Sequence, residues 1–165
     1  MRRRLLIARG LLNSPEILIL DEPTIGLDPQ AKYLVWHKLI ESKSKGVTQL
    51  LSTQNMEEAA ALCDRVAIMH QGTILDIDSP TKLISKYVGE QIWEIEVDLE
   101  HEREAREHLR MRGFEFEEVG NAIHIFRVKY DEHIREMANI LRGFRQRSGT
   151  LEDVFLRLTG RSLIE

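Results

Sequence analysis

An aliphatic run that ends in two adjacent carboxylates is the feature that most constrains this chain. Residues 17–20 are all aliphatic, and Asp21 and Glu22 follow directly. Pro15 and Pro23 bound the segment. A short, unbroken aliphatic run of this kind predicts a strand buried on both faces of a parallel sheet. Because open α/β sheets bind ligands beyond the carboxyl ends of such strands, we expect both acids at a ligand site.

The neighbouring carboxylates of Asp21 and Glu22 need a partner. Two adjacent acids repel each other, and burying both is costly without a cation or hydrogen-bond donors. A hard cation such as Mg²⁺, holding phosphates, would relieve this repulsion. Asp21 would then contact the metal, and Glu22 would orient or deprotonate a water molecule. The alternative is that the pair only ends the strand and is solvated, because short acidic motifs are weak signals.

The residues after the acids extend the pattern. Residues 26–29 read Gly-Leu-Asp-Pro, and the whole string 17–29 resembles the Walker B segment and D-loop of ATP-binding-cassette (ABC) transporter ATPases. The resemblance implies ATP and Mg²⁺ as ligands, with Asp21 as the magnesium-site acid and Glu22 as the hydrolytic base. It also implies that Gly26 and Asp28 lie at a nucleotide and dimer interface, facing a second ATPase subunit. Asp28 before a proline is also a favourable helix start, so capping alone explains it.

The segments that grip a nucleotide's phosphates do not occur in this sequence. A phosphate-binding loop needs Gly-x-x-x-x-Gly-Lys-Ser/Thr. Neither this string nor the Leu-Ser-Gly-Gly signature of ABC ATPases is found in the 165 residues. Residues 2–12 favour a helix, yet the arginines at 2–4 oppose the helix dipole and no capping residue precedes them. The resemblance implies a longer helix that follows the signature loop, so that Met1 is an internal residue or an internal start.

A second strand is expected over residues 47–52, and it ends at Thr53-Gln54-Asn55. In ABC ATPases the corresponding strand end carries a switch histidine that hydrogen-bonds the γ-phosphate, and Gln54 stands at that position here. A glutamine amide donates a hydrogen bond but cannot take up a proton. Gln54 is therefore a candidate catalytic residue that either senses phosphate or marks a degenerate site.

The chain changes character near residues 88–91. The later pattern predicts the order β-α-β-β-α-β, with a hairpin turn at Gly120-Asn121 and a helix over 131–142, which favours a ferredoxin-like layer. A terminal helix is expected over 150–159. Its sequence, Leu151-Glu-Asp-Val-Phe-Leu-Arg-Leu-Thr-Gly, resembles the C-terminal signature of one ABC branch, the bacterial drug-resistance, nodulation and lipo-oligosaccharide exporters. The expected fold class is α/β. A partial P-loop NTPase (RecA-like) core with parallel strands occupies 1–89, and a small α+β ferredoxin-like accessory or regulatory domain occupies 90–165.

The composition limits the kinds of partner that this chain is expected to bind. A net charge of −4 gives no electrostatic case for nucleic acid. No apolar run is long enough to span a bilayer. The single cysteine, Cys63, excludes an intrachain disulfide, fits a reducing cytosol, and is expected to be a small core residue. The resemblance adds a transmembrane permease and a second ATPase subunit as partners. It also implies a cytoplasmic location, peripheral on the inner face of the bacterial cell membrane.

Three functional hypotheses follow. The first is the ATP-binding and ATP-hydrolysing subunit of an ABC-type exporter, present here as its C-terminal part. The family is an ATPase, and we expect this chain alone to be inactive and to bind Mg-ATP weakly or not at all. The second is a non-catalytic interaction or dimerisation fragment, because uncovered sheet edges and apolar faces tend to pair. The third is a mis-called start of a full-length ATPase.

Overall fold

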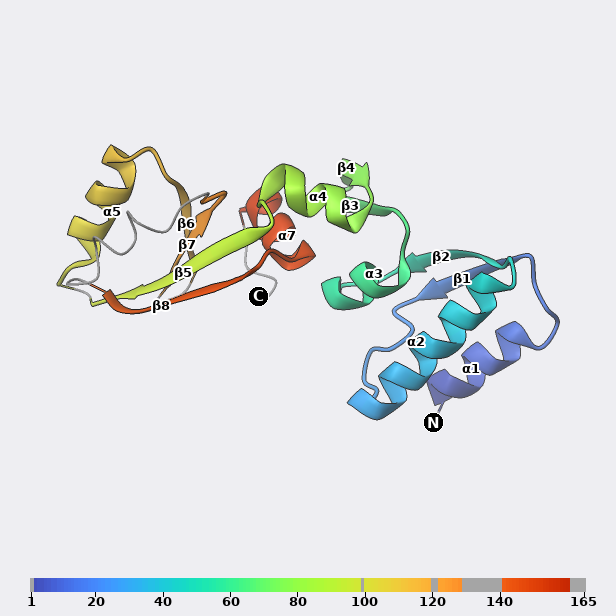
Figure 1. Cartoon of the computed structure of the whole chain (residues 1–165). Helices are drawn as coiled ribbons and strands as arrows, with labels where there is room; N and C mark the ends of the chain where they lie inside the picture. The colour runs from blue at the N-terminus through green and yellow to red at the C-terminus, as the bar shows by residue number, and fades with distance from the viewer. Residues whose placement is uncertain (1, 99, 120–121, 129–140, 161–165) are drawn as a thin grey trace. The chain divides into compact units, whose positions relative to one another are not determined.

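The computed structural model describes residues 2–98, 100–119, 122–128 and 141–160. The chain forms two compact units, residues 1–66 and 67–165 (Figure 1). The elements of unit 1 are α1 (Arg2–Leu11), β1 (Ile17–Asp21), α2 (Pro29–Ser44), β2 (Thr48–Ser52) and α3 (Met56–Leu62). The elements that follow are β3 (Val66–His70), β4 (Thr73–Asp78), α4 (Pro80–Tyr87), β5 (Gln91–Val97), α5 (Glu102–Met111), β6 (Glu115–Val119), β7 (Ala122–Phe126), β8 (Leu141–Ser148) and α7 (Leu151–Thr159).

Unit 1 is built on a parallel pair of strands. β1 and β2 pair in register from Ile17 opposite Thr48 to Asp21 opposite Ser52. The helices α1 and α2 lie along one face of this pair (Figure 1). The core between sheet and helices is formed by Leu18, Leu20, Val35, Trp36, Leu39 and Leu62. The predicted parallel pairing is therefore confirmed for these two strands.

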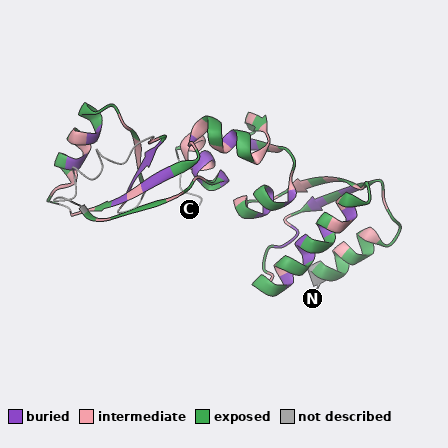
Figure 2. Ribbon diagram, in the orientation of Figure 1, coloured by how far each residue is buried: buried purple, intermediate pink, exposed green. Residues whose placement is uncertain are grey.

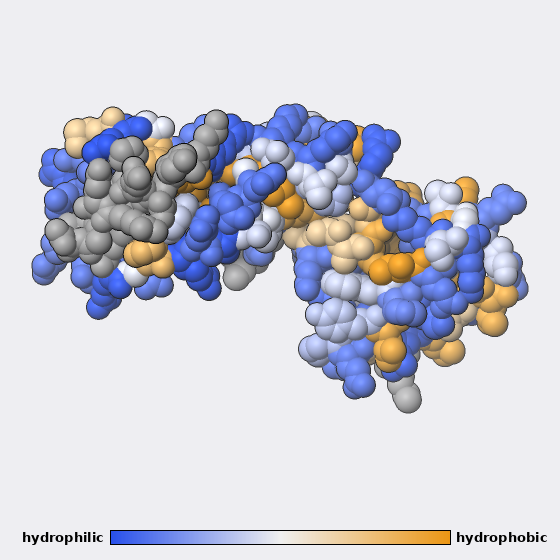
Figure 3. Space-filling view, in the orientation of Figure 1, coloured by the Kyte–Doolittle hydropathy of each residue, from blue (hydrophilic) through white to orange (hydrophobic). Residues whose placement is uncertain are grey.

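The predicted burial of β1 on both faces is wrong. Leu18 and Leu20 point into the core, whereas Ile17 and Ile19 are 64% and 72% exposed. Leu50 on β2 is likewise 64% exposed. The helices of unit 1 cover only one face of the pair, so every second side chain of the aliphatic run reaches the surface. Figure 3 shows such apolar side chains, in orange, at the surface of this unit.

The start of α2 matches the sequence prediction. Asp28 is the N-cap residue, its Oδ1 accepts a hydrogen bond of 2.9 Å from the Ala31 N–H, and Pro29 is the first helical residue. Gly46 follows the helix with a φ of +94°, a conformation that glycine adopts without strain. The cap fixes where the loop from β1 ends and the helix begins.

Unit 2 contains an antiparallel sheet of four strands in the order β6-β7-β5-β8. Trp93 and Ile95 on the central strand β5 pack with Ala105 and Leu109 of α5 in a buried cluster. The long buried stretch of β5 is purple in Figure 2. The described residues thus form a mixed α/β protein with the parallel pair β1–β2, a two-stranded sheet of β3 and β4, and the antiparallel four-stranded sheet.

Part of the predicted pattern in unit 2 lies outside the described residues. This applies to the Gly120-Asn121 turn and to most of the expected helix over 131–142. Leu141 and Arg142, which were expected to end that helix, begin β8 instead. Among the residues that the structure describes, no helix is long and apolar enough to cross a membrane.

Candidate functional site

The carboxyl ends of β1 and β2 lie side by side and place Asp21 at the edge of the sheet. Ser52 is its register partner, and Ser52 Oγ donates a hydrogen bond to Asp21 Oδ1. Asp21 is exposed, so its carboxylate is open to a ligand. Carboxylate and hydroxyl groups are the hard oxygen donors that suit Mg²⁺, which usually takes one or two carboxylates and completes its shell with water and phosphate oxygens.

A complete metal cage is absent around this edge. Within the described ranges, no group of three or more His, Cys, Asp or Glu side chains could hold a metal ion. A single carboxylate such as that of Asp21 is what a Mg²⁺ ion held mainly by nucleotide phosphates takes from a protein.

Glu22 is fixed by the end of the neighbouring strand. Its backbone N–H donates to Ser52 O at 2.9 Å. Its Oε1 accepts a hydrogen bond of 2.9 Å from the backbone N–H of Gln54, and its Oε2 accepts one of 3.4 Å from Thr53 Oγ1. The structure thus brings the two candidate catalytic residues Glu22 and Gln54 together. The contact uses the backbone N–H of Gln54, and Gln54 is an exposed residue.

Glu22 also has an unusual backbone conformation. Its φ is +45°, in the left-handed region that residues other than glycine rarely enter. Such a conformation costs roughly 1–3 kcal/mol and persists only where the surroundings enforce it, most often at functional sites. The hydrogen bonds from the end of β2 hold Glu22 in place. In this conformation the Glu22 carboxylate contacts Thr53 and Gln54, just after β2.

The loop between the acids and α2 is a tight double turn. Ile25 N–H donates to Glu22 O at 3.4 Å, and Leu27 N–H donates to Thr24 O at 3.1 Å. Gly26 has a φ of +74° and lies at the surface, where an added Cβ would meet no neighbour. The backbone conformation, and not crowding, therefore calls for glycine at this position. Gly26 and Asp28 are both exposed.

Sequence reasoning missed a buried polar group beneath this loop. Glu58 on α3 has no exposed surface, and its Oε1 accepts hydrogen bonds from Thr24 Oγ1 at 2.7 Å and Trp36 Nε1 at 3.0 Å. The sequence context alone suits Glu58 to the first turn of a helix and Trp36 to packing in the core. The available signal was the indole N–H, which needs an acceptor when a tryptophan is buried.

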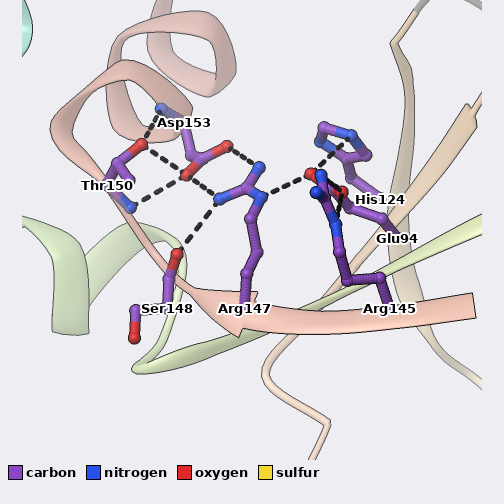
Figure 4. Close-up of polar contacts among 7 residues, drawn as sticks. All are labelled: Glu94, His124, Arg145, Arg147, Ser148, Thr150 and Asp153. Carbon is purple, nitrogen blue, oxygen red and sulfur yellow. Dashed lines mark hydrogen bonds and ion pairs between the residues drawn. The ribbon is translucent and has the colours of Figure 1, made fainter.

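A second polar cluster lies in unit 2 and ties α7 to the sheet (Figure 4). Arg147 on β8 donates to Asp153 Oδ1 and Oδ2 at 2.7 and 2.8 Å, and its Nε donates to Glu94 on β5. Arg145 also donates to Glu94, at 2.9 Å from its Nε. His124 on β7 places its Nε2 3.5 Å from Glu94 Oε1. The cluster links three strands to the first turn of α7.

The charges in this cluster shift one another's pKa values. Burial alone raises the pKa of Asp153, but hydrogen bonds from Arg147 and Thr150 outweigh it and lower the pKa below its ordinary value. The pKa of Glu94 is lowered in the same way, against its burial, by Arg147 and Arg145. Burial lowers the pKa of His124 despite the nearby Glu94 carboxylate. Each of these carboxylates is already paired with an arginine, so we interpret the cluster as structural.

The Cys63 thiol lies partly buried against the core of unit 1. Burial raises its pKa, which keeps the thiol protonated and unreactive. This agrees with its expected role as a small core residue.

Comparison with known proteins gives relatives over nearly the whole chain. Nod factor export ATP-binding protein I of Rhizobium meliloti is 42% identical over 165 residues, which make up 99% of this chain and 48% of the relative. The protein of the same name from Bradyrhizobium diazoefficiens is 40% identical over 167 residues, 99% of this chain and 53% of the relative. The chain therefore spans about half the length of the curated relatives it matches. No family model matches the chain.

A solved structure titled "Structure of ATP binding subunit of ABC transporter" is also similar. It is 32% identical, covers 45% of this chain and 31% of that chain, and has a TM-score of 0.41. A TM-score this low does not establish a shared fold.

The acid pair and the Gly-Leu-Asp-Pro loop, together with these relatives, define a class. The chain matches about half of the length of ABC-transporter ATP-binding subunits. Among these, it is similar to the Nod factor export ATP-binding proteins I.

Proposed function

We propose that this chain supplies the metal-binding and water-activating part of the ATP-binding subunit of an ABC-type exporter. Asp21 is the ligand of Mg²⁺, and Glu22 orients and deprotonates the water that attacks the γ-phosphate. The observation that carries the proposal is the placement of both acids at the carboxyl end of β1, with Glu22 held in a strained conformation by the end of β2.

The proposal gives each residue a separate task. Mg²⁺, when bound with ATP, would neutralise phosphate charge near Asp21. The Glu22 carboxylate accepts hydrogen bonds from the end of β2 and so keeps a fixed orientation, as a general base requires. Gln54 is the second residue after β2, and its amide is suited to donate a hydrogen bond to a phosphate oxygen. Since an amide takes up no proton, Gln54 positions the phosphate and does not act as an acid or base.

The remaining parts of the proposal concern architecture and partners. Residues 1–89 form the later part of a P-loop core, and residues 90–165 form a ferredoxin-like accessory domain. The antiparallel order β6-β7-β5-β8 supports the second assignment. Gly26 and Asp28 face a second ATPase subunit, and a transmembrane permease holds the pair at the inner face of the bacterial cell membrane. The exposure of Gly26 and Asp28 supports an interface at this loop.

The affinity of the chain for ATP tests this proposal. Because the sequence holds no phosphate-binding loop, we expect ATP to bind weakly or not at all in calorimetric titrations with and without Mg²⁺. The variant Asp21→Asn should behave like the parent chain. Micromolar ATP binding that requires Asp21 would show that the chain binds nucleotide by itself, which contradicts a role limited to metal binding and water activation.

A second candidate function is self-association. The uncovered face of the β1–β2 pair favours it, since Ile17, Ile19 and Leu50 are each more than 60% exposed there. Neighbouring exposed apolar side chains of this kind commonly mark an interaction surface.

Sedimentation velocity distinguishes the two functions. Self-association predicts a dimer whose stability drops when Ile19→Lys places a charge on the exposed sheet face. The matched control is Leu12→Lys, which changes another exposed apolar residue, 78% exposed, outside the sheet. A monomer at high concentration argues against the second function and leaves the first intact.

A further inference from the structure

The carboxyl group of Glu58, in the first turn of the short helix α3, is completely buried. Its Oε1 accepts two hydrogen bonds, from Thr24 and Trp36, and its Oε2 has no hydrogen-bond partner among the described residues. Burying a carboxyl group with an unpaired oxygen is costly. A position that only filled space would be occupied more favourably by an apolar side chain. The two hydrogen bonds that Glu58 accepts therefore indicate a role beyond packing.

Glu58 joins three segments that surround the acid pair. Thr24 lies in the middle of the loop between Glu22 and Asp28. Trp36 belongs to α2, the helix that Asp28 caps. Glu58 itself lies in the first turn of α3, where its N–H donates to Oδ1 of the N-cap residue Asn55 at 3.0 Å.

The segment before α3 is the one that holds Glu22. Thr53 and Gln54 donate hydrogen bonds to the Glu22 carboxylate, and Asn55 follows them directly. Within the loop on the other side, Ile25 and Leu27 donate turn hydrogen bonds. The Thr24–Glu58 bond connects the two sides.

We infer that Glu58 is a positioning residue for the acid pair. Its carboxyl group fastens the loop after Glu22 to the helix after Gln54, so that the Glu22 carboxylate stays in contact with the end of β2. The inference rests on the proposed function for its meaning in catalysis. The contact itself is a property of the chain without nucleotide, and it can be measured in that state.

Amide hydrogen exchange, measured by NMR on the full 165-residue chain without nucleotide, tests this role. The reporters are the N–H groups of Gln54, which donates to Glu22, and of Leu27, which donates to Thr24. Amides in the middle of α2 report on global unfolding. In Glu58→Ala we expect exchange at both reporters to accelerate about tenfold or more relative to the α2 amides, since a buried bond to a carboxylate is lost.

Conservative and neighbouring variants separate positioning from general stability. Glu58→Gln keeps a carbonyl oxygen that can accept both hydrogen bonds, so exchange at the reporters should stay within about threefold of the parent. Glu57→Ala is the matched control, because Glu57 is on the same helix with 63% of its side chain exposed and contacts Lys32 at the surface. It should leave both reporters unchanged.

A second pair of variants covers the case in which Glu58→Ala does not fold. Thr24→Val removes only the hydroxyl donor and keeps the side-chain shape, whereas Thr24→Ser keeps the donor. Thr24→Val should accelerate exchange at Gln54, and Thr24→Ser should not. The inference is overturned if Thr24→Val and Glu58→Ala leave Gln54 as protected as Glu57→Ala does, or if Glu58→Gln is as damaging as Glu58→Ala. Because no nucleotide is present, these outcomes do not depend on whether Asp21 binds Mg²⁺.

Discussion

Removing Arg147 should destabilise unit 2 far more than removing Arg145, although both arginines lie on β8 and both bind Glu94. Arg147 has 25% of its side chain exposed and also binds Asp153, whose side chain is 4% exposed. Arg145 has 73% of its side chain exposed and has no hydrogen bond to Asp153. The pair of variants Arg147→Met and Arg145→Met therefore compares a buried contact with a surface contact on the same strand and the same acceptor.

The magnitude follows from what each deletion leaves behind. Without Arg147, Asp153 Oδ2 still accepts hydrogen bonds from the N–H and the hydroxyl of Thr150, at 2.8 and 2.6 Å. Its Oδ1 loses the 2.7 Å bond from Arg147 in a nearly buried position. An unpaired buried oxygen costs about 1–3 kcal/mol, and breaking a fully buried ion pair costs about 3–5 kcal/mol. Since Arg147 is partly exposed, we expect a loss of about 2–3 kcal/mol.

The loss for Arg145→Met should be much smaller. Ion pairs between exposed groups contribute about 0–1 kcal/mol, because water screens them. Glu94 also keeps its bond from Arg147 in this variant. We therefore expect about 0.5 kcal/mol.

Urea unfolding at pH 7 measures both values. Methyl NMR signals of Ile95 and Ile125, which are fully buried in the core of unit 2, report on this unit alone. Equal losses for Arg147→Met and Arg145→Met, or a loss below about 1 kcal/mol for Arg147→Met, would refute the reasoning. The double variant Arg147→Met with Asp153→Asn should be less destabilised than the sum of the single variants, because they remove the same contact.

Two further predictions concern pH and the start of α2. The pKa of His124 is lowered in the folded chain from its ordinary value of 6.5. The unfolded chain therefore binds more protons as the pH falls below 6.5, and unit 2 should lose stability between pH 7 and pH 5. His124→Gln should flatten this part of the urea-midpoint profile. The lowered pKa values of Glu94 and Asp153 add stability above about pH 4.5, which is lost on further acidification. Asp28→Ala should lower the stability of unit 1 by about 1 kcal/mol, and Asp28→Asn by much less, because asparagine keeps an oxygen that can cap the helix. Urea unfolding midpoints measure both losses. Equal losses would exclude capping as the stabilising contact.

Local features of this fold could be predicted from the sequence with good accuracy. The order Asp28-Pro29 specified the start of α2, because an oxygen at the N-cap and a proline at the first helical position satisfy local rules alone. The parallel pairing of β1 and β2 was predicted from the short aliphatic run over residues 17–20. These features depend on neighbouring residues and need no knowledge of the rest of the molecule.

Other features depended on what packs against each element. The run from Ile17 to Leu20 is apolar throughout, yet only alternate side chains are buried, because helices lie on one face of the pair. The pattern could not reveal which face is covered. Glu58 was even less visible, since its burial results from the meeting of α3, α2 and the loop at Thr24. Its sequence context, in the first turn of a short helix, is typical of an exposed glutamate.

The candidate site also has one feature that the sequence predicts and one that it does not. The acid pair could be recognised from the string itself, and the structure places it at a strand end, as expected. The left-handed conformation of Glu22 could not be predicted, because it is imposed by hydrogen bonds from β2, about 30 residues later.

Hydrolysis of ATP by a chimeric subunit tests the central claim most directly. The chimera joins this full chain to the remaining half of the Rhizobium meliloti relative and carries Gln54→His, so that the missing switch histidine does not limit the rate. We expect Mg²⁺-dependent hydrolysis that falls about 100-fold or more in Glu22→Gln while ATP still binds, because only the base for the attacking water is lost. Glu57→Gln, at an exposed position on α3, is the control and should retain the rate. A Glu22→Gln chimera that hydrolyses ATP as fast as its parent would contradict the account.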